Sequence, residues 1–259
     1  MTHDETIQPD APILEFDETR EAVLEPAKLI TPRDVPRHVV VCFFQDVITH
    51  LAQRHEMRVV KHLRSEIGTH PVYEMQFEGR RLAVFHPGVG APLAAAFLEE
   101  VIALGCHNFI ACGGAGVLDS QIAVGHVVVP TAAIRDEGTS YHYLPPAREV
   151  EASPAAVAAI EATLAARNVE YVLGKTWTTD AIYRETPGKV RRRRAEGCLT
   201  VEMETAAFFA VARYRDVPFG QMLYGGDDVA AEQWDARGWT THDVREKLFW
   251  LAAEACLKL

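Results

Sequence analysis

The chain has 259 residues, of which 48% are hydrophobic, 24% charged and 8% aromatic. These values are typical of a globular protein and exclude a disordered chain, a collagen and a disulfide-stapled miniprotein. The 36 acidic residues outnumber the 26 Lys and Arg, and the net charge of -10 disfavours binding to nucleic acid or to an anionic membrane, although a local pocket can still bind a small anion.

The cysteines and the N-terminus indicate a cytoplasmic protein. The five cysteines are widely spaced and include no C-x-x-C pair, which favours reduced thiols over disulfides or a zinc site. The first 26 residues are acidic and lack the apolar core of a signal peptide. No run reaches the roughly 18 uncharged apolar residues of a membrane span, so we expect neither a membrane nor a nucleic-acid partner.

Strands and helices are expected to alternate after an N-terminal arm. Residues 1–38 are rich in proline and acid, which predicts an extended arm rather than a domain. The first half of the remaining chain is expected to contain a strand at 39–44, a helix at 45–55, two strands within 71–85 around a turn at Glu78-Gly79, a Gly/Pro loop at 86–92 and a helix at 93–104.

The second half continues the pattern. We expect a strand at 108–112 running into a glycine loop at 113–116, a strand at 126–130, a helix at 153–167, a strand at 170–177, a mainly helical stretch at 201–215, a strand at 218–224 and a helix from about 241 to 258. This alternation predicts one α/β domain over residues 39–259, with a central mixed, mostly parallel sheet flanked by helices.

Four loops follow predicted strands, at 86–92, 113–116, 178–186 and 225–228, where ligands bind in such sheets. Two of them carry glycines, Gly88 and Gly90 in one and Gly113 and Gly114 in the other. Glycine lets backbone N–H groups approach an anion or a sugar. Each loop alone is typical of a plain turn, but together they favour a binding site. Neither has the spacing of a dinucleotide or ATP loop.

Acidic residues follow two of the strands. Glu204, in the sequence VEME (201–204), is expected at a helix start, where its carboxylate can accept hydrogen bonds from a ribose diol; the alternative is an acid favoured there by the helix dipole. Asp227 and Asp228 are adjacent, so their repulsion can raise one pKa and create a general acid, or they form an ordinary charged turn. No histidine partners lie nearby at ligand spacing, which disfavours a metal.

The only basic run, KVRRRR (189–194), is expected to be a solvated helix face rather than a nucleic-acid patch. Single histidines such as His86 are expected to be structural.

Taken in order, several segments resemble the nucleoside phosphorylase-I family, which includes uridine phosphorylases, hexameric purine nucleoside phosphorylases and methylthioadenosine/S-adenosylhomocysteine nucleosidases. The resemblance covers about 39–259 and is carried by HPGVGAP (86–92), FIACGGAGVLDSQIAVGHVVVP (109–130), IRDEGTSYH (134–142), TTDAIYRET (178–186) and VEMETAA (201–207). It implies the phosphorylase-type fold and a catalytic domain that cleaves nucleosides.

The resemblance also implies roles for residues. Met203 and Glu204 match the pair that contacts ribose. Asp227 matches the acid that protonates a purine, and Asp228 is the alternative after a small loop shift. The base is implied to contact Ile182, Tyr183 and Arg184, with Arg184 or Thr186 supporting a departing pyrimidine. Gly88, Gly90, Gly113 and Gly114 match the anion-binding loops.

Departures from the family concern phosphate. The strand at 39–44 runs into Gln45-Asp46, where phosphorylases have G-D-P-x-R; Ala111 stands where a second arginine is usual and Gly114 where a Ser or Thr is usual, while a third arginine, from a neighbouring subunit, aligns near Gly68. Gly226 replaces the Ser that precedes the acid. Phosphate normally needs Arg or Lys, which leaves His86, Arg64 and Arg135 as candidates.

The sequence therefore predicts a nucleoside phosphorylase that uses phosphate as co-substrate and needs no cofactor or metal. Hydrolysis by water is the alternative, because the phosphate arginines are missing, and a nucleoside-binding protein without turnover is a third possibility. The resemblance implies a homo-oligomer, a dimer or a hexamer, with the arm at an interface. Purine or pyrimidine, and ribose or deoxyribose, remain open.

Overall fold

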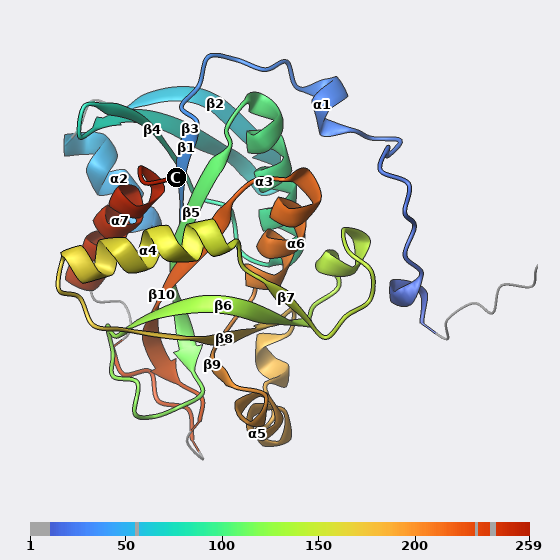
Figure 1. Cartoon of the computed structure of the whole chain (residues 1–259), viewed down its shortest axis with the longest axis vertical. Helices are drawn as coiled ribbons and strands as arrows, with labels where there is room; N and C mark the ends of the chain where they lie inside the picture. Colours follow the sequence, from blue (N-terminus) through green and yellow to red (C-terminus); the bar gives the residue numbers. More distant parts are fainter. Residues whose placement is uncertain (1–10, 55–56, 231–232, 239–241) are drawn as a thin grey trace, which may run out of the picture.

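The computed structural model describes residues 11–54, 57–230, 233–238 and 242–259 (Figure 1). The chain forms a mixed sheet in the order β10-β6-β8-β9-β5-β1-β4-β3-β2, with β7 beside β6. Helices cover the sheet, so the predicted α/β fold with a mixed sheet is confirmed. Within the described parts of the chain, no helix is both long and apolar enough to cross a lipid bilayer.

The strands are β1 (His38–Cys42), β2 (Arg58–Ser65), β3 (Gly68–Phe77), β4 (Arg80–Phe85), β5 (Asn108–Val117), β6 (Val127–Asp136), β7 (Glu149–Glu151), β8 (Tyr171–Thr179), β9 (Cys198–Glu202) and β10 (Phe219–Asp228). The helices are α1 (Pro26–Leu29), α2 (Gln45–Arg54), α3 (Ala91–Leu104), α4 (Pro154–Ala166), α5 (Pro187–Ala195), α6 (Thr205–Arg215) and α7 (His242–Cys256), with short 3-10 helices η1 (Pro12–Leu14), η2 (Thr139–His142) and η3 (Ile182–Arg184).

Two apolar layers hold the helices on the sheet. On one face, α2, α4 and α7 bury side chains such as Leu51, Ile160 and Phe249 against β1, β5 and β10. On the other, α3 and α6 bury Phe97 and Phe208, and the two helices lie side by side (Figure 1). Since both faces are covered, the central strands are buried and their carboxyl ends are the accessible part of the sheet.

Strand β5 changes partner halfway along its length. Its first half pairs with β1, ending at the pair Cys42 and Cys112, and its last residues pair with β9, beginning at Gly116 and Val201. Its other edge pairs with β10. Because β10, β6, β8 and β9 pair in turn, these strands close into a ring with β5. Residues 113–115 of β5 therefore lie at an open edge, between the end of β1 and the end of β9.

The structure corrects several boundaries. The glycines at 113–116 are not a loop but part of β5, and Gly225 to Asp228 belong to β10, with a register shift between them. Val201 and Glu202 are strand rather than helix. Strand β2 was not predicted, because this edge strand is charged and mostly exposed.

The described part of the arm, 11–37, runs along α3 and α6 and extends beyond the sheet in Figure 1. It is attached by polar contacts: the Tyr214 hydroxyl donates to the Arg20 carbonyl at 2.7 Å, and Glu25 pairs with Arg215 at 3.0 Å. Apolar residues of the arm such as Val23 and Leu29 remain exposed. Its contact with a neighbouring subunit stays a prediction.

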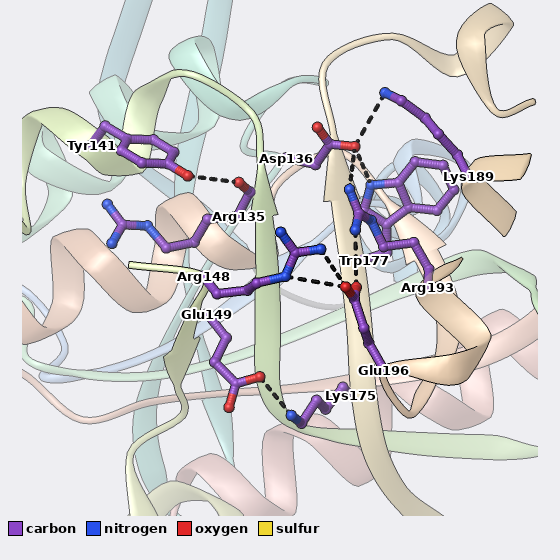
Figure 2. Close-up of polar contacts among 10 residues, drawn as sticks. All are labelled: Arg135, Asp136, Tyr141, Arg148, Glu149, Lys175, Trp177, Lys189, Arg193 and Glu196. Carbon is purple, nitrogen blue, oxygen red and sulfur yellow. Dashed lines mark hydrogen bonds and ion pairs between the residues drawn. The ribbon is translucent and has the colours of Figure 1, made fainter. Parts of the chain in front are cut away.

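Helix α5 presents the predicted solvated basic face at Arg191, Arg192 and Arg194, which are exposed, but not at Arg193. The Arg193 side chain is only 7% exposed and pairs with Asp136 at 3.1 Å. Oδ2 of Asp136, at the end of β6, also accepts from the Trp177 indole at 2.9 Å and from Lys189 at 3.2 Å (Figure 2). Hydrogen bonds to this one oxygen therefore connect α5 with β6 and β8. Helix α5 in turn holds in place the segment that precedes it along the chain.

Replacing Asp136 by Ala should lower the free energy of unfolding by about 3 kcal/mol, because Arg193 would keep a buried charge with only Glu196 as its carboxylate partner. Urea denaturation measures this. The matched control is Glu149→Gln, which removes the half-exposed pair with Lys175 at 2.5 Å and should cost less than about 1 kcal/mol. Equal losses in the two variants would contradict the role assigned to Asp136.

Candidate active site

Glu204 follows β9 and lies against the first glycine loop. Its side chain is buried, with 6% exposure for the residue, and Oε1 accepts the Gly90 N–H at 2.6 Å while Oε2 accepts the Met203 N–H at 3.2 Å. Gly90 has φ of 92°, a conformation that glycine adopts without strain. The structure thus brings Glu204 into direct contact with this loop, while its contact with a sugar stays a prediction.

Glu202 positions the turn that carries Glu204. Its Oε2 accepts the N–H groups of Glu204 and Thr205 at 2.7 and 2.6 Å, and Oε1 accepts the Thr178 hydroxyl at 2.7 Å. Burial raises the pKa of Glu202, and burial followed by the charge of Glu202 raises the pKa of Glu204 to about 8. Glu204 thus keeps its proton to a higher pH than a free glutamate does. A diol that donates hydrogen bonds to Glu204 favours its ionised form, so sugar binding should release this proton.

His86 is held as a structural residue. Its Nδ1 accepts the Gly88 N–H at 3.0 Å, so the ring proton is on Nε2, which donates to the Phe43 carbonyl at 3.1 Å. Burial lowers the pKa of this imidazole. Both nitrogens are engaged and the ring is neutral, so His86 fixes the glycine loop and is a poor ligand for phosphate.

Gly113 and Gly114 sit between aromatic rings. A methyl group on Gly113 would lie 3.1 Å from the Phe43 ring, and one on Gly114 would lie 3.0 Å from the Tyr224 ring. A Ser or Thr at position 114, as in the family, would require the Tyr224 ring to move by a few tenths of an ångström. The backbone of β5 here is open toward the end of β9, where its N–H groups are available to a ligand.

Asp227 and Asp228 have different surroundings. The Trp234 indole donates to Oδ2 of Asp227 at 2.7 Å, and its Oδ1 is 3.6 Å from the point where Gly116 would carry a methyl group. Asp228 is buried, and its Oδ1 accepts the Ala230 N–H at 2.8 Å in a tight turn. The carboxylate of Asp228 is thus used by the backbone, and Asp227 remains the predicted acid. A methyl group on Gly116 would also lie 3.1 Å from Val201 of β9. Gly116 of β5 therefore lies between Asp227 and β9, the strand that leads to Glu204.

The predicted base-contacting residues lie on η3. Ile182 is 54% exposed and Tyr183 95% exposed, and Arg184 is exposed too. Both apolar side chains face solvent in the single chain, and the structure gives no contact between them and Glu204 or Asp227. The Thr186 hydroxyl accepts the Lys189 N–H at the start of α5, a capping role.

Two of the arginines considered for phosphate are placed elsewhere. Arg135 is buried and donates to Ser140 and to the carbonyls of Leu144 and Pro145, a structural role. Arg64 is exposed on β2, at the far edge of the sheet from β10. No group of three or more metal-ligating side chains comes together among the described residues.

Arg245, on α7, is the cation that the sequence analysis missed. Its Nη1 donates to Asp46 at 2.8 Å and its guanidinium lies 4.8 Å over the Phe44 ring. The side chain is 16% exposed, and its Nε is buried with no hydrogen-bond partner among the described residues. The positive charge of Arg245 contributes to the lowered pKa of His86 and opposes the rise that burial causes in the pKa of Tyr224. It therefore lies beside the position where the family's G-D-P-x-R loop would supply an arginine.

A cavity of about 910 Å³ lies between the arm and the helices α3 and α6. Pro92, two residues after Gly90, and Asp180, whose charge acts on Glu204, both line it. The rest of its wall is formed by arm and helix residues, among them Glu99 and Arg215. The cavity thus adjoins the segments that carry Gly90 and Asp180, and Glu204 does not line it.

Known proteins resemble this chain in sequence and in fold. The sequence profile of the phosphorylase superfamily matches residues 37–257. The chain belongs to this superfamily. A guanosine phosphorylase of Halorubrum lacusprofundi is 33% identical over 165 residues, which are 62% of this chain and 68% of that protein. A uridine phosphorylase of Treponema pallidum is 33% identical over 153 residues, 55% of this chain and 59% of that protein, less than two thirds of its length.

A solved structure also shares the superfamily fold. A purine nucleoside phosphorylase from Toxoplasma gondii, in complex with immucillin-H, has a TM-score of 0.76 at 20% identity and covers 87% of this chain and 92% of its own. At that identity the likeness shows the fold alone. As a member of the superfamily, the chain is an enzyme of the nucleoside phosphorylase and nucleosidase class.

Proposed function

We propose that this chain is a nucleoside phosphorylase, which cleaves the N-glycosidic bond and transfers the pentose to phosphate. The observation that carries the proposal is the buried Glu204 carboxylate, seated on the Gly90 N–H. A carboxylate there can accept hydrogen bonds from two neighbouring sugar hydroxyls, and Asp227, on the next strand, can donate a proton to the departing base. The guanosine and uridine phosphorylases among its relatives support the same chemistry.

The protein accelerates the reaction by placing groups around a sugar that becomes oxocarbenium-like. As the bond to the base breaks, its electron pair moves into the base, and a nucleophile bonds to the anomeric carbon. Glu204 and Met203 are proposed to hold the pentose, and the backbone of Gly113 and Gly114 to face the nucleophile. Such positioning supplies much of the rate enhancement in this kind of reaction.

Arg245 is proposed to supply the positive charge for phosphate that the missing arginines would have given. It already binds an anion, the Asp46 carboxylate, and its buried Nε is free to donate. Arg245→Met should therefore raise KM for phosphate by about 10–100-fold, the loss expected for one charge-assisted contact. Initial rates at varied phosphate measure this, with the exposed Arg213→Met as the control variant.

Hydrolysis is the second candidate reaction. The Arg245 guanidinium is already paired with Asp46, and both ring nitrogens of His86 are hydrogen-bonded, which leaves less for phosphate to bind. The product separates the two reactions: phosphorolysis yields a pentose 1-phosphate, and hydrolysis yields the free pentose. Base release that needs phosphate and yields the sugar phosphate supports the proposal. Equal base release in phosphate-free buffer, with free pentose as the product, would replace it by hydrolysis.

We also infer a cytoplasmic homo-oligomer, a dimer or a hexamer, with the arm at an interface. Exposed apolar residues of the arm, Val23, Leu24 and Leu29, support this. Sedimentation of the full chain and of a chain that lacks residues 1–30 tests it: loss of assembly is expected without the arm.

A further inference from the structure

We propose that Trp234 forms an aromatic wall of the nucleobase site, where its indole is held beside the base by the Asp227 carboxylate. The proposal rests on the proposed nucleoside cleavage and adds a base-binding residue to that site. Trp234 was not among the residues expected from the sequence, which implied base contacts at 182–184 only.

Trp234 is in direct contact with the predicted acid. Its indole N–H donates to Oδ2 of Asp227 at 2.7 Å. An indole is a donor with one N–H, so it engages Oδ2 alone, and a base can bond to Oδ1. That second oxygen lies on the side of Gly116, 3.6 Å from the point where this glycine would carry a methyl group. A base bound at Oδ1 therefore has the indole as its neighbour on the same carboxylate.

The segment that carries the indole, residues 233–238, is fastened to the end of β10. Asp228 and Asp235 exchange backbone hydrogen bonds of 2.8 and 3.1 Å. The Arg237 guanidinium donates twice to the Gly226 carbonyl, at 2.6 and 2.9 Å. Arg237 also adopts φ of 44°, a conformation that costs a non-glycine residue free energy and persists only where the surroundings fix it. These contacts set the position of the indole relative to the acid.

The indole offers apolar surface that a ligand can cover. Trp234 is 64% exposed, although its N–H is already bonded to a carboxylate. Contact between an aromatic side chain and a nucleobase is favourable for every base, because each base has a π face. The residues implied from the sequence, Ile182 and Tyr183, are exposed on η3, whereas Trp234 touches Asp227. The structure therefore favours Trp234 as the aromatic neighbour of a base at this acid.

An aromatic wall and a general acid affect different kinetic constants. The wall contacts the base both before and during bond cleavage, so its removal weakens binding of substrate and transition state alike and raises KM. The acid acts mainly as the bond breaks, so its removal lowers kcat. Trp234 is thus expected to act mainly on KM, in contrast to Asp227.

Steady-state kinetics with guanosine and uridine test this. For each nucleoside that the wild type cleaves, Trp234→Ala should raise KM by about 5–100-fold, the loss expected for one base–aromatic contact, and should change kcat less. Trp234→Phe keeps a ring without the N–H donor and should raise KM less. The control is Trp250→Phe on α7, whose ring stacks on Phe77 at 5.2 Å between centroids. This variant should match the wild type.

A binding measurement tests the same contact without turnover. The free bases hypoxanthine and uracil are titrated into the protein while tryptophan emission is recorded. Quenching by at least one base is expected in the wild type and in Trp250→Phe. It should be lost in Trp234→Phe, because the indole that the base covers is then absent.

Each outcome decides one point. A wild-type KM in Trp234→Ala, or base quenching that persists in Trp234→Phe, would overturn the role of Trp234 and leave nucleoside cleavage intact. If Trp234→Ala unfolds, the KM and the quenching of Trp234→Phe decide instead. If the wild type cleaves neither nucleoside, the proposed function fails, and quenching that depends on Trp234 would still support the indole as a base-binding wall.

Discussion

Glu204→Gln is expected to lower kcat/KM for nucleoside cleavage by about 10²–10³-fold, because one neutral amide oxygen replaces the carboxylate that we propose accepts two sugar hydroxyls. The amide keeps the size of the side chain and can still accept the Gly90 N–H. The fold should therefore remain, and thermal unfolding should show it. Most of the loss should appear in kcat/KM rather than in protein stability.

The matched control is Glu151→Gln on β7, an exposed acid outside the site, which should keep wild-type activity. A Glu204→Gln variant that folds and retains full activity would show that the acid does not contact the sugar. Activity lost together with the folded structure would leave Glu204 in a structural role, as the alternative of a helix-start acid implies.

Asp227→Asn is expected to lower purine nucleoside cleavage by about 10²–10⁴-fold, the usual contribution of a general acid. The adjacent Asp228→Asn provides the comparison, because an asparagine oxygen can still accept the Ala230 N–H. It should stay close to wild type in both rate and stability. The pair of variants also decides which of the two adjacent acids acts, a choice that the sequence left open.

The reverse result would identify Asp228, rather than Asp227, as the general acid. If Asp228→Asn loses activity and Asp227→Asn keeps it, the β10 register must change when substrate binds, since Asp228 is now buried in a turn. If neither variant loses activity, neither Asp227 nor Asp228 protonates the base, and the general acid must be another group.

The sequence predicted the fold class, because this depends on local signals. Alternating apolar runs gave the α/β order, and the Glu in VEME follows a strand whose register brings it to the glycines of β5. The glycines of 113–116 were mistaken for a loop, because the reason for them is tertiary: the rings of Phe43 and Tyr224 leave little room for a side chain.

Residues brought in by distant segments were not predicted. Arg245 meets Asp46 from 199 positions away, and no local pattern marks it, so the sequence analysis considered only His86, Arg64 and Arg135 for phosphate. Arg193, expected in solvent, is buried because Asp136 and Trp177 lie beneath α5. Packing, rather than composition, determines the positions of both arginines.

The central claim, that Glu204 holds the sugar hydroxyls, is tested most directly by a substrate-by-variant cycle. The kcat/KM values for guanosine and 3′-deoxyguanosine are compared in the wild type and in Glu204→Gln. The wild type should prefer guanosine by about 10–100-fold, and the variant should lose most of that preference, since the missing hydroxyl and the missing charge remove the same contact. The same preference in both proteins would contradict the claim.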